Sequence, residues 1–183
     1  IYLIIHNRPP KHDLLLPMQK CVIMREFFRH YTQTQQEVQA MATAEAKISV
    51  VVPVYNARSY LPRVLKSLLD QTIGFDALQV FFCDDCSTDG SFAYETELAK
   101  TYPNITVLQT KQNSGFAGAP RNLALEQLRT PYVMFLDNDD ALMPQACELL
   151  YQEAQSSGAD LVTGRYQEVT EDGTPACRVR TGV

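Results

Sequence analysis

The side chains best suited to chemistry lie directly after three runs of buried-type residues, and most of them are carboxylates. Asn56 follows the run ending in Pro53–Tyr55, and the second and third runs are followed by Asp84–Ser91 (DDCSTDGS) and Asp137–Asp140 (DNDD). Clustered carboxylates repel one another unless positive charge lies between them. Oxygen ligands without histidine or paired cysteine suit Mg²⁺ or Mn²⁺, which one or two carboxylates hold together with substrate phosphates. The pattern therefore predicts a site for a divalent cation and a nucleoside diphosphate.

Each of these features also has a simpler interpretation when taken alone. Asp137–Asp140 could be a solvated loop, Asp89 could cap a helix, and Arg121 could be a surface charge. Cys83 and Cys86 form a C-x-x-C motif, but Cys83 closes a buried run and no second pair exists, which disfavours zinc or redox chemistry. The order of all the clusters along the chain is what favours a shared site.

The elements that would position these residues alternate regularly from Lys47 onward. Apolar, β-rich runs predict strands at Ile48–Tyr55, Leu78–Cys83, Ile105–Gln109, Tyr132–Leu136 and Leu161–Val169. Helical spacing predicts helices at Ser59–Gln71, Asp89–Tyr102, Pro120–Arg129 and Pro144–Ser157, the last ended by Gly158. Asp172-Gly173 predicts a hairpin turn into Ala176–Arg180.

Alternation of strands and helices predicts an α/β domain with a mostly parallel central sheet flanked by helices. In such sheets ligands bind outside the carboxyl ends of the strands. We therefore expect six acids to converge on one rim: Asp84, Asp85, Asp89, Asp137, Asp139 and Asp140.

Composition excludes several classes of protein. The chain has 183 residues, of which 45% are hydrophobic and 20% charged, and its net charge of −5 disfavours binding to nucleic acid. Its first apolar run, Ile1–Ile5, is far shorter than the ~20 residues of a membrane span. Five cysteines without regular spacing indicate free thiols in a reducing, cytoplasmic compartment. The histidines all precede residue 31, so the main domain would work without imidazole.

Residues 1–46 differ from the rest because they show no clear alternation of elements. They contain a helix-compatible segment, Met24–Ala46, and Met41 lies shortly before the first strong strand. We consider two interpretations: a non-native extension preceding a domain that begins near Met41, or a helical arm packed on that domain. Residues 47–183 form the predicted main domain.

The four blocks that carry this pattern resemble family 2 glycosyltransferases, inverting nucleotide-sugar-dependent enzymes with a Rossmann-like GT-A fold. The blocks are Ile48–Asn56 with Tyr60-Leu61 and Leu68–Thr72, then Asp84–Ser91, Asn113–Asn122 and Phe135–Asp140. They cover roughly Lys47 to Ala159. The Pro120-Arg121-Asn122 form is similar to that of enzymes that glycosylate teichoic-acid-type cell-wall polymers.

The resemblance implies roles for individual residues. It implies that the nucleotide-sugar is bound by Pro53, Tyr55, Asn56, Asp85, Arg121, Asp137 and Asn138. Pro53 and Tyr55 would line the nucleobase pocket, and Asp85 would accept a hydrogen bond from a uracil-type base. Asp137-Asn138-Asp139 would be the D-x-D motif, with Asp139 and Asp137 as the ligands of Mn²⁺ or Mg²⁺.

The sequence departs from the family pattern at Cys86, where glycine is usual. A position that prefers positive φ would be mildly strained by cysteine. Inverting transfer requires a general base, and the resemblance implies an aspartate in an acidic motif well after the D-x-D. Glu171-Asp172 comes too early and is interpreted as a turn, so the base is expected beyond Val183. We therefore expect a donor-binding part of a longer enzyme, truncated at its C-terminus.

The resulting hypothesis is transfer of a sugar, from UDP-sugar, to a saccharide, cell-wall polymer or lipid-linked acceptor. We also expect bacterial origin and peripheral association with the inner face of the membrane. The alternative is a non-catalytic nucleotide-binding fragment or degenerate paralogue. A hydride-transferring Rossmann enzyme is disfavoured because no G-x-G-x-x-G follows the first strand.

Overall fold

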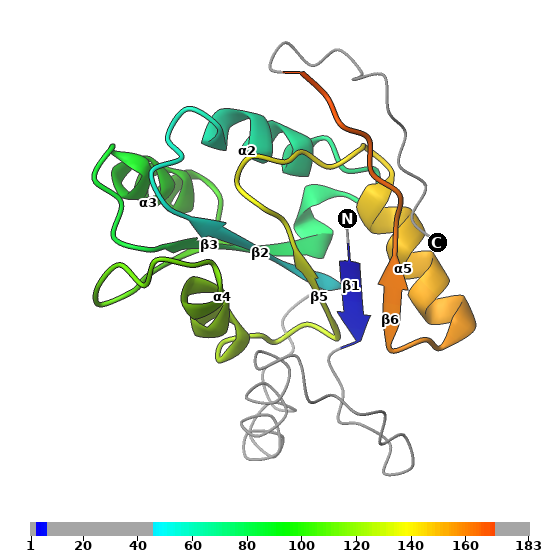
Figure 1. Ribbon diagram of the computed structural model, residues 1–183. Helices are drawn as coiled ribbons and strands as arrows, with labels where there is room; N and C mark the ends of the chain where they lie inside the picture. The colour runs from blue at the N-terminus through cyan, green and yellow to red at the C-terminus, as the bar shows by residue number, and fades with distance from the viewer. Residues whose placement is uncertain (1–2, 7–45, 171–183) are drawn as a thin grey trace.

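A six-stranded sheet forms the centre of the computed structural model, which describes residues 3–6 and 46–170 (Figure 1). The strand order is β4-β3-β2-β5-β1-β6. The strands are β1 (Leu3–His6), β2 (Ile48–Val54), β3 (Leu78–Asp84), β4 (Ile105–Gln109), β5 (Tyr132–Phe135) and β6 (Leu161–Thr163).

The strands β2, β3, β4 and β5 are parallel to one another, which confirms the mostly parallel sheet. All seven residues of β2 are buried because it lies between β3 and β5. The register pairs Val54 with Asp84 and Val51 with Phe135. The carboxyl ends of β2, β3 and β5 therefore meet at one edge of the sheet, as predicted.

Helices cover both faces of this sheet. They are α2 (Leu61–Leu69), α3 (Ser91–Thr101), α4 (Gly118–Leu125) and α5 (Ala146–Ser157), with a short 3₁₀ turn η1 (Phe75–Ala77) before β3. Each predicted helix is confirmed, with ends that differ by at most four residues. Gly158 ends α5 in the left-handed conformation, at φ 64°, as expected. In Figure 1, α2 and α4 lie on opposite sides of the sheet.

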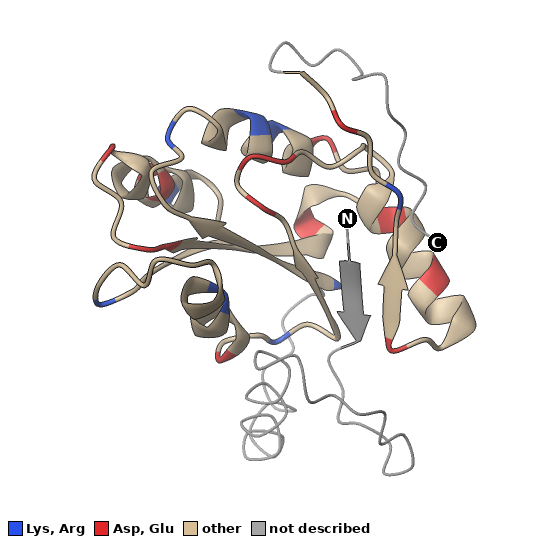
Figure 2. Cartoon of the chain, viewed as in Figure 1, with Lys and Arg blue, Asp and Glu red and all other residues tan. Residues whose placement is uncertain are grey.

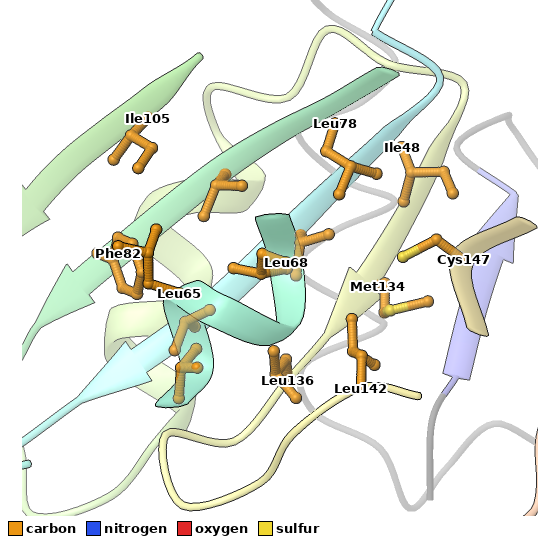
Figure 3. Close-up of a cluster of buried hydrophobic side chains, with 14 of the residues drawn as sticks. Ile48, Leu65, Leu68, Leu78, Phe82, Ile105, Met134, Leu136, Leu142 and Cys147 are labelled. Carbon is orange, nitrogen blue, oxygen red and sulfur yellow. The ribbon is translucent and has the colours of Figure 1, made fainter. Parts of the chain in front are cut away.

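Two buried clusters follow from the alternation of side chains along β2. Val50 and Val52 face a larger cluster with α2 and α5, whereas Val51 faces a smaller cluster with Ala124 of α4. Figure 3 shows part of the larger cluster, where Leu65 and Leu68 lie over the sheet. This packing fixes α2 and α4 relative to the strand ends between them.

Gln71, just after α2, ties this helix to the chain that follows β5. Its Nε2 donates to the carbonyl of Met143 at 2.9 Å, and its Oε1 accepts from the amide of Cys147 at 3.0 Å. Gln71 is buried, so these bonds are shielded from water. The segment between β5 and α5 is thereby held at a fixed place beside α2.

The strand β1 is the main departure from the sequence prediction. It pairs antiparallel with β5 on one side and β6 on the other, and so joins β6 to the rest of the sheet. We predicted no strand there, and both interpretations of residues 1–46 left that region outside the sheet. The predicted helix Met24–Ala46 lies outside the described residues, and the domain boundary near residue 47 stays a prediction.

The C-terminal strand is shorter than predicted. β6 ends at Thr163 rather than Val169, and its residues Leu161, Val162 and Thr163 pair with β1. The predicted hairpin into Ala176–Arg180 lies outside the described residues. Among the helices in the described part, none has the length and apolar character needed to cross a membrane.

Candidate functional site

Hydrogen bonds join the loops that follow β2, β3 and β5, so the predicted convergence at one edge is confirmed for these loops. Asn138 Nδ2, after β5, donates to the carbonyl of Pro53 in β2 at 2.9 Å. Asn56 Oδ1, after β2, accepts from the amide of Thr88 at 2.8 Å. Figure 2 shows acidic residues along the loop after β5, beside the basic residues of α2.

Asp85 is buried at the end of β3 and is held by donors from a distant loop. Its Oδ1 accepts from Thr110 Oγ1 at 2.7 Å, and its Oδ2 accepts from the amide and the hydroxyl of Ser114 at 2.9 and 2.8 Å. Burial works to raise the pKa of this carboxyl, but these hydrogen bonds outweigh it and lower the pKa. Asp85 is therefore an ionised acceptor at neutral pH.

The turn after β2 is fixed against the start of α3. Asn56 adopts φ 48°, a left-handed conformation that asparagine tolerates, and its amide donates to Ser87 Oγ at 2.9 Å. Asp89 Oδ2 accepts from the amide of Arg58 at 2.9 Å, and its Oδ1 accepts from the amide of Ser91 at 3.0 Å. These bonds overcome the effect of burial and lower the pKa of Asp89.

The expectation that Asp89 is the N-cap of the helix is corrected in one respect. The cap position belongs to Gly90, at φ 90°, and α3 begins at Ser91. Asp89 still accepts the amide hydrogen of Ser91, so its carboxylate satisfies a donor at the helix start from one position further back.

Cys86 occupies a left-handed conformation at φ 61°, as predicted for a position where glycine is usual. Its Sγ donates to the carbonyl of Thr110 at 3.2 Å, which ties the loop after β3 to the end of β4. The C-x-x-C motif holds no disulfide, since Cys83 and Cys86 are both free thiols. Burial raises the pKa of Cys83 to about 12, so its thiol is unreactive at neutral pH.

The loop Asp137–Asp140, called the D-x-D loop below, is held from both sides of the sheet. Arg121, on α4, donates from Nη2 to Asp137 Oδ1, and its guanidinium lies 5.4 Å from the centre of the Phe135 ring. Arg63, on α2, donates from Nη2 to the backbone carbonyl of Asp139. The amide of Asp140 donates to the carbonyl of Asp137 at 3.1 Å and closes a turn.

The charge of this loop suits a cation. Partial burial, followed by the charges of Asp139 and Asp137, raises the pKa of Asp140 despite the nearby Arg63. No three acidic, histidine or cysteine side chains of the described ranges lie close enough to form a complete metal site. The oxygen donors of the loop fit Mg²⁺ or Mn²⁺ held by one or two carboxylates and completed by phosphate oxygens.

The base-lining residues of the prediction differ in exposure. Tyr55 is 50% exposed, so its ring is available to a ligand, whereas Pro53 is buried within β2. The carbonyl of Pro53 accepts the hydrogen bond from Asn138 Nδ2 that joins β2 to the loop after β5. The nucleobase role of these two residues stays a prediction.

Asp84 does not lie on the rim, which corrects the expectation of six converging acids. It is fully buried, and its Oδ2 accepts from the amide of Ser87 at 2.9 Å and from Gln109 Nε2 at 3.0 Å. Behind it lies Glu95 of α3, also fully buried, with both carboxyl oxygens lacking a hydrogen-bond partner among the described residues. Burial, then the charges of Asp84 and Asp89, raises the pKa of Glu95 to about 8.

A cavity of about 780 Å³ lies beside the D-x-D loop. It is bounded by the start of α2, by the loop itself and by the chain after β6. Its lining residues are Ser59, Tyr60, Arg63, Asp139, Asp140 and 166–170.

Sequence reasoning missed Glu95, Arg63 and the partners of Asp85. Glu95 could have been found, because Ser91, Glu95 and Leu98 recur at helical spacing on the buried face of α3. Arg63 and Thr110 carry no comparable local signal, since their contacts join segments far apart in the chain.

A mostly parallel sheet with acidic loops at the carboxyl ends of its parallel strands is typical of a Rossmann-like α/β domain. Residues 49–180 match the family model described as glycosyl transferase family 2. The chain therefore belongs to glycosyl transferase family 2.

The chain is similar to glycosyltransferases named for poly(ribitol-phosphate). The poly(ribitol-phosphate) beta-glucosyltransferase of Bacillus spizizenii is 33% identical over 129 residues, 70% of this chain and 20% of that protein. The poly(ribitol-phosphate) beta-N-acetylglucosaminyltransferase TarP of Staphylococcus aureus is 37% identical over 122 residues, 66% of this chain and 36% of that protein.

Solved structures give the same likeness. The crystal structure of S. aureus TarS 1-349 in complex with UDP-GlcNAc has a TM-score of 0.56 and 34% identity, and covers 60% of this chain and 31% of that one. The fold is thus that of GT-A glycosyltransferases. The chain spans 20% and 36% of the lengths of the two curated relatives above.

Proposed function

We propose that this chain is the donor-binding part of a glycosyltransferase that transfers a sugar from UDP-sugar to a cell-wall polymer. The observation that carries the proposal is the joined set of loops around Asp85, Arg121 and Asp137–Asp139, in a domain of glycosyl transferase family 2. Relatives named for transfer to poly(ribitol-phosphate) support a polymer acceptor over a small saccharide or a lipid-linked one.

The chain's own residues would bind the uridine diphosphate. The ionised Asp85 carboxylate would accept the N–H of a uracil-type base, and the exposed ring of Tyr55 would pack on the base. Asn56 and Asn138 would act through the loops they hold in register, because their side-chain atoms are bonded to backbone groups. Arg121, already beside Asp137, would offer its guanidinium to the diphosphate.

Asp139 and Asp137 are the proposed ligands of a divalent cation. Mn²⁺ or Mg²⁺ bound there would neutralise the charge that develops on the departing diphosphate. Burial is the main cause of the raised pKa of Asp140, and the nearby negative charges of Asp139 and Asp137, which a cation would offset, add to it. We also propose that the transfer inverts the configuration of the sugar and takes place in the cytoplasm, beside the inner face of the membrane.

A second candidate is a nucleotide-binding fragment without transferase activity. Both candidates predict binding of UDP, and they differ only in turnover.

A thermal-shift panel of UDP, GDP, CDP and dTDP with Mn²⁺ tests the nucleotide. We expect the largest rise in Tm with UDP, because ligands that bind only the folded state stabilise it. An equal or larger rise with GDP or CDP would contradict a UDP-sugar donor.

A further inference from the structure

Two buried carboxyls with unused hydrogen-bonding atoms lie behind the loop that follows β3. Asp84 ends β3, and Glu95 lies in α3, which packs against β3 and β4. Both side chains are fully buried. Oδ1 of Asp84 and both carboxyl oxygens of Glu95 have no hydrogen-bond partner within the described ranges. Because buried polar atoms are almost always satisfied, these three oxygens need an explanation.

The alternation of side chains along β3 directs Asp84 toward α3. Phe82 belongs to the larger buried cluster together with Leu98 of α3, whereas Cys83 belongs to the smaller cluster on the α4 side. Asp84 therefore points to the same face of the sheet as Phe82. Glu95 precedes Leu98 by three residues and shares its buried face of α3. The two carboxyls therefore lie on the same side of the sheet.

Hydrogen bonding indicates which of the two carboxyls keeps a proton. Asp84 Oδ2 accepts from the amide of Ser87 and from Gln109 Nε2, and bonds of this kind favour the ionised form. Glu95 accepts no such bond from a described residue. Because two neighbouring buried carboxyls strongly disfavour double ionisation, the proton belongs on Glu95. A protonated carboxyl is a donor, and Asp84 Oδ1 is an unused acceptor.

The groups packed around Glu95 favour its neutral form. The strand β4 has no ionisable side chain, and β3 adds the neutral thiol of Cys83. Asp89 adds a second negative charge, while Arg58 lies 3.9 Å from the centre of the Tyr94 ring and stacks on it. Burial, followed by the charges of the two nearby aspartates, raises the pKa of Glu95 to about 8.

We propose that Glu95 is a positioning residue for nucleotide binding, whose neutral carboxyl donates to Asp84 Oδ1 and so fixes the loop after β3. The inference rests on the proposed function, which assigns the neighbouring Asp85 to the base. Asp84 holds the amide of Ser87, and the Ser87 hydroxyl in turn accepts the amide hydrogen of Asn56. The carboxyl pair therefore supports both the loop after β3 and the turn after β2.

Loss of the Glu95 proton to solvent should weaken this support. Ionised Glu95 offers no donor to Asp84 and places a second negative charge near it, so the two carboxylates repel each other. UDP then binds best to the protonated form, whose fraction falls as the pH rises through about 8. The apparent affinity falls with that fraction, by about fourfold between about pH 6.5 and about pH 8.5.

The test is calorimetric titration of UDP in Mn²⁺ at these two pH values. Glu95→Gln keeps a donor toward Asp84 but cannot ionise. Between the two pH values, UDP binding to the unchanged chain should weaken about fourfold more than binding to Glu95→Gln. At the higher pH the unchanged chain should also take up most of one proton on binding, and Glu95→Gln should take up less. Repeating the titration in buffers of different ionisation enthalpy measures this uptake.

A second variant and a control complete the design. Glu95→Leu offers neither a donor nor a charge and should bind UDP about threefold or more weakly than Glu95→Gln at both pH values. Glu97→Gln removes a carboxylate from the exposed face of α3, where Glu97 pairs with Lys100, and should behave as the unchanged chain does. This control includes any effect of pH on Mn²⁺ or on the uracil ring.

The outcomes separate this inference from the proposed function. Failure of UDP to bind at the lower pH would overturn the proposed function and this inference with it. Binding of UDP with the same pH dependence and the same proton uptake in the unchanged chain and in Glu95→Gln would overturn only this inference. Equal affinities of Glu95→Leu and Glu95→Gln would also overturn it, because the donor would then be dispensable.

Discussion

Arg121 donates a hydrogen bond from Nη2 to Oδ1 of Asp137 and so joins α4 to the first aspartate of the D-x-D loop. The pair is asymmetric in exposure, because the Arg121 side chain is 22% exposed and that of Asp137 is 55% exposed. The arginine is thus held in place by packing while the aspartate faces solvent. This contact connects the block Asn113–Asn122 to the candidate cation site.

Replacing this arginine tests the role of the contact in nucleotide binding. Arg121→Ala should weaken UDP binding in Mn²⁺ by about tenfold or more, because it removes a charge-assisted donor at the diphosphate. Calorimetric titration of UDP measures the effect. Arg129→Ala is the matched control, since Arg129 follows the same helix and its side chain donates to the neighbouring carbonyl of Leu128. Equal affinities for the two variants would contradict the role.

Because of Glu95, the free energy of unfolding should fall as the pH rises above neutral. Burial, with the charges of Asp84 and Asp89, raises its pKa from 4.5 to about 8. A carboxyl with a raised folded-state pKa contributes stability that is fully present below 4.5 and is lost as the pH rises through about 8. Urea unfolding at about pH 6 and about pH 9 should therefore show a loss of a few kcal/mol.

The variant Glu95→Gln should show a smaller loss over the same pH range, because glutamine does not ionise. Other groups that face Glu95 are Asp84, Asp89 and the neutral thiol of Cys83. Glu97→Gln is the control, since Glu97 lies on the exposed face of α3 and pairs with Lys100. Identical pH profiles for Glu95→Gln and the unchanged chain would show that Glu95 does not hold a proton.

Cys86 should tolerate glycine but not a β-branched residue. At φ 61° glycine relieves backbone strain of about 1 kcal/mol. Two effects offset part of this gain: the hydrogen bond from Sγ to the Thr110 carbonyl is lost, and glycine has a greater conformational entropy in the unfolded chain. The free energy of unfolding of Cys86→Gly should therefore lie within about 1 kcal/mol of that of the unchanged chain. Cys86→Val should be clearly less stable. Thermal unfolding distinguishes them, and equal melting temperatures for both variants would contradict a left-handed Cys86.

The strand β1 should be needed for full stability. A chain that begins at Ala46 would leave β6 without its strand partner and β5 with an unpaired side. We expect this truncation to lower the free energy of unfolding by about 1 kcal/mol or more, from lost backbone hydrogen bonds. Ile4→Pro in the full chain, which removes one ladder donor, should act in the same direction. A truncated chain as stable as the full one would favour a dispensable extension.

The central strands could be predicted from the sequence because each is a continuous run of apolar residues. Ile48–Val54 and Leu78–Cys83 are mostly apolar on both faces, which is typical of a strand inside a parallel sheet. The loops with Asp85 and Asp137–Asp140 follow those strands directly, so their meeting at one edge needed no further information.

The remaining features depend on contacts between distant segments. Leu3–His6 is too short to be recognised as a strand without β5 and β6 on either side. Arg63 is an ordinary helix residue until α2 packs beside the D-x-D loop. Asp84 differs from Asp85 only in its direction, since successive side chains of a strand point to opposite faces.

The central claim is a uridine-diphosphate site completed by a divalent cation at the D-x-D loop. Calorimetric titration of UDP into the chain with Mn²⁺, and again with excess EDTA, tests it most directly. We predict binding with Mn²⁺, at least tenfold weaker binding with EDTA, and a similar loss in Asp139→Ala. Equal binding in Mn²⁺ and EDTA, or binding unaffected by Asp139→Ala, would contradict the account.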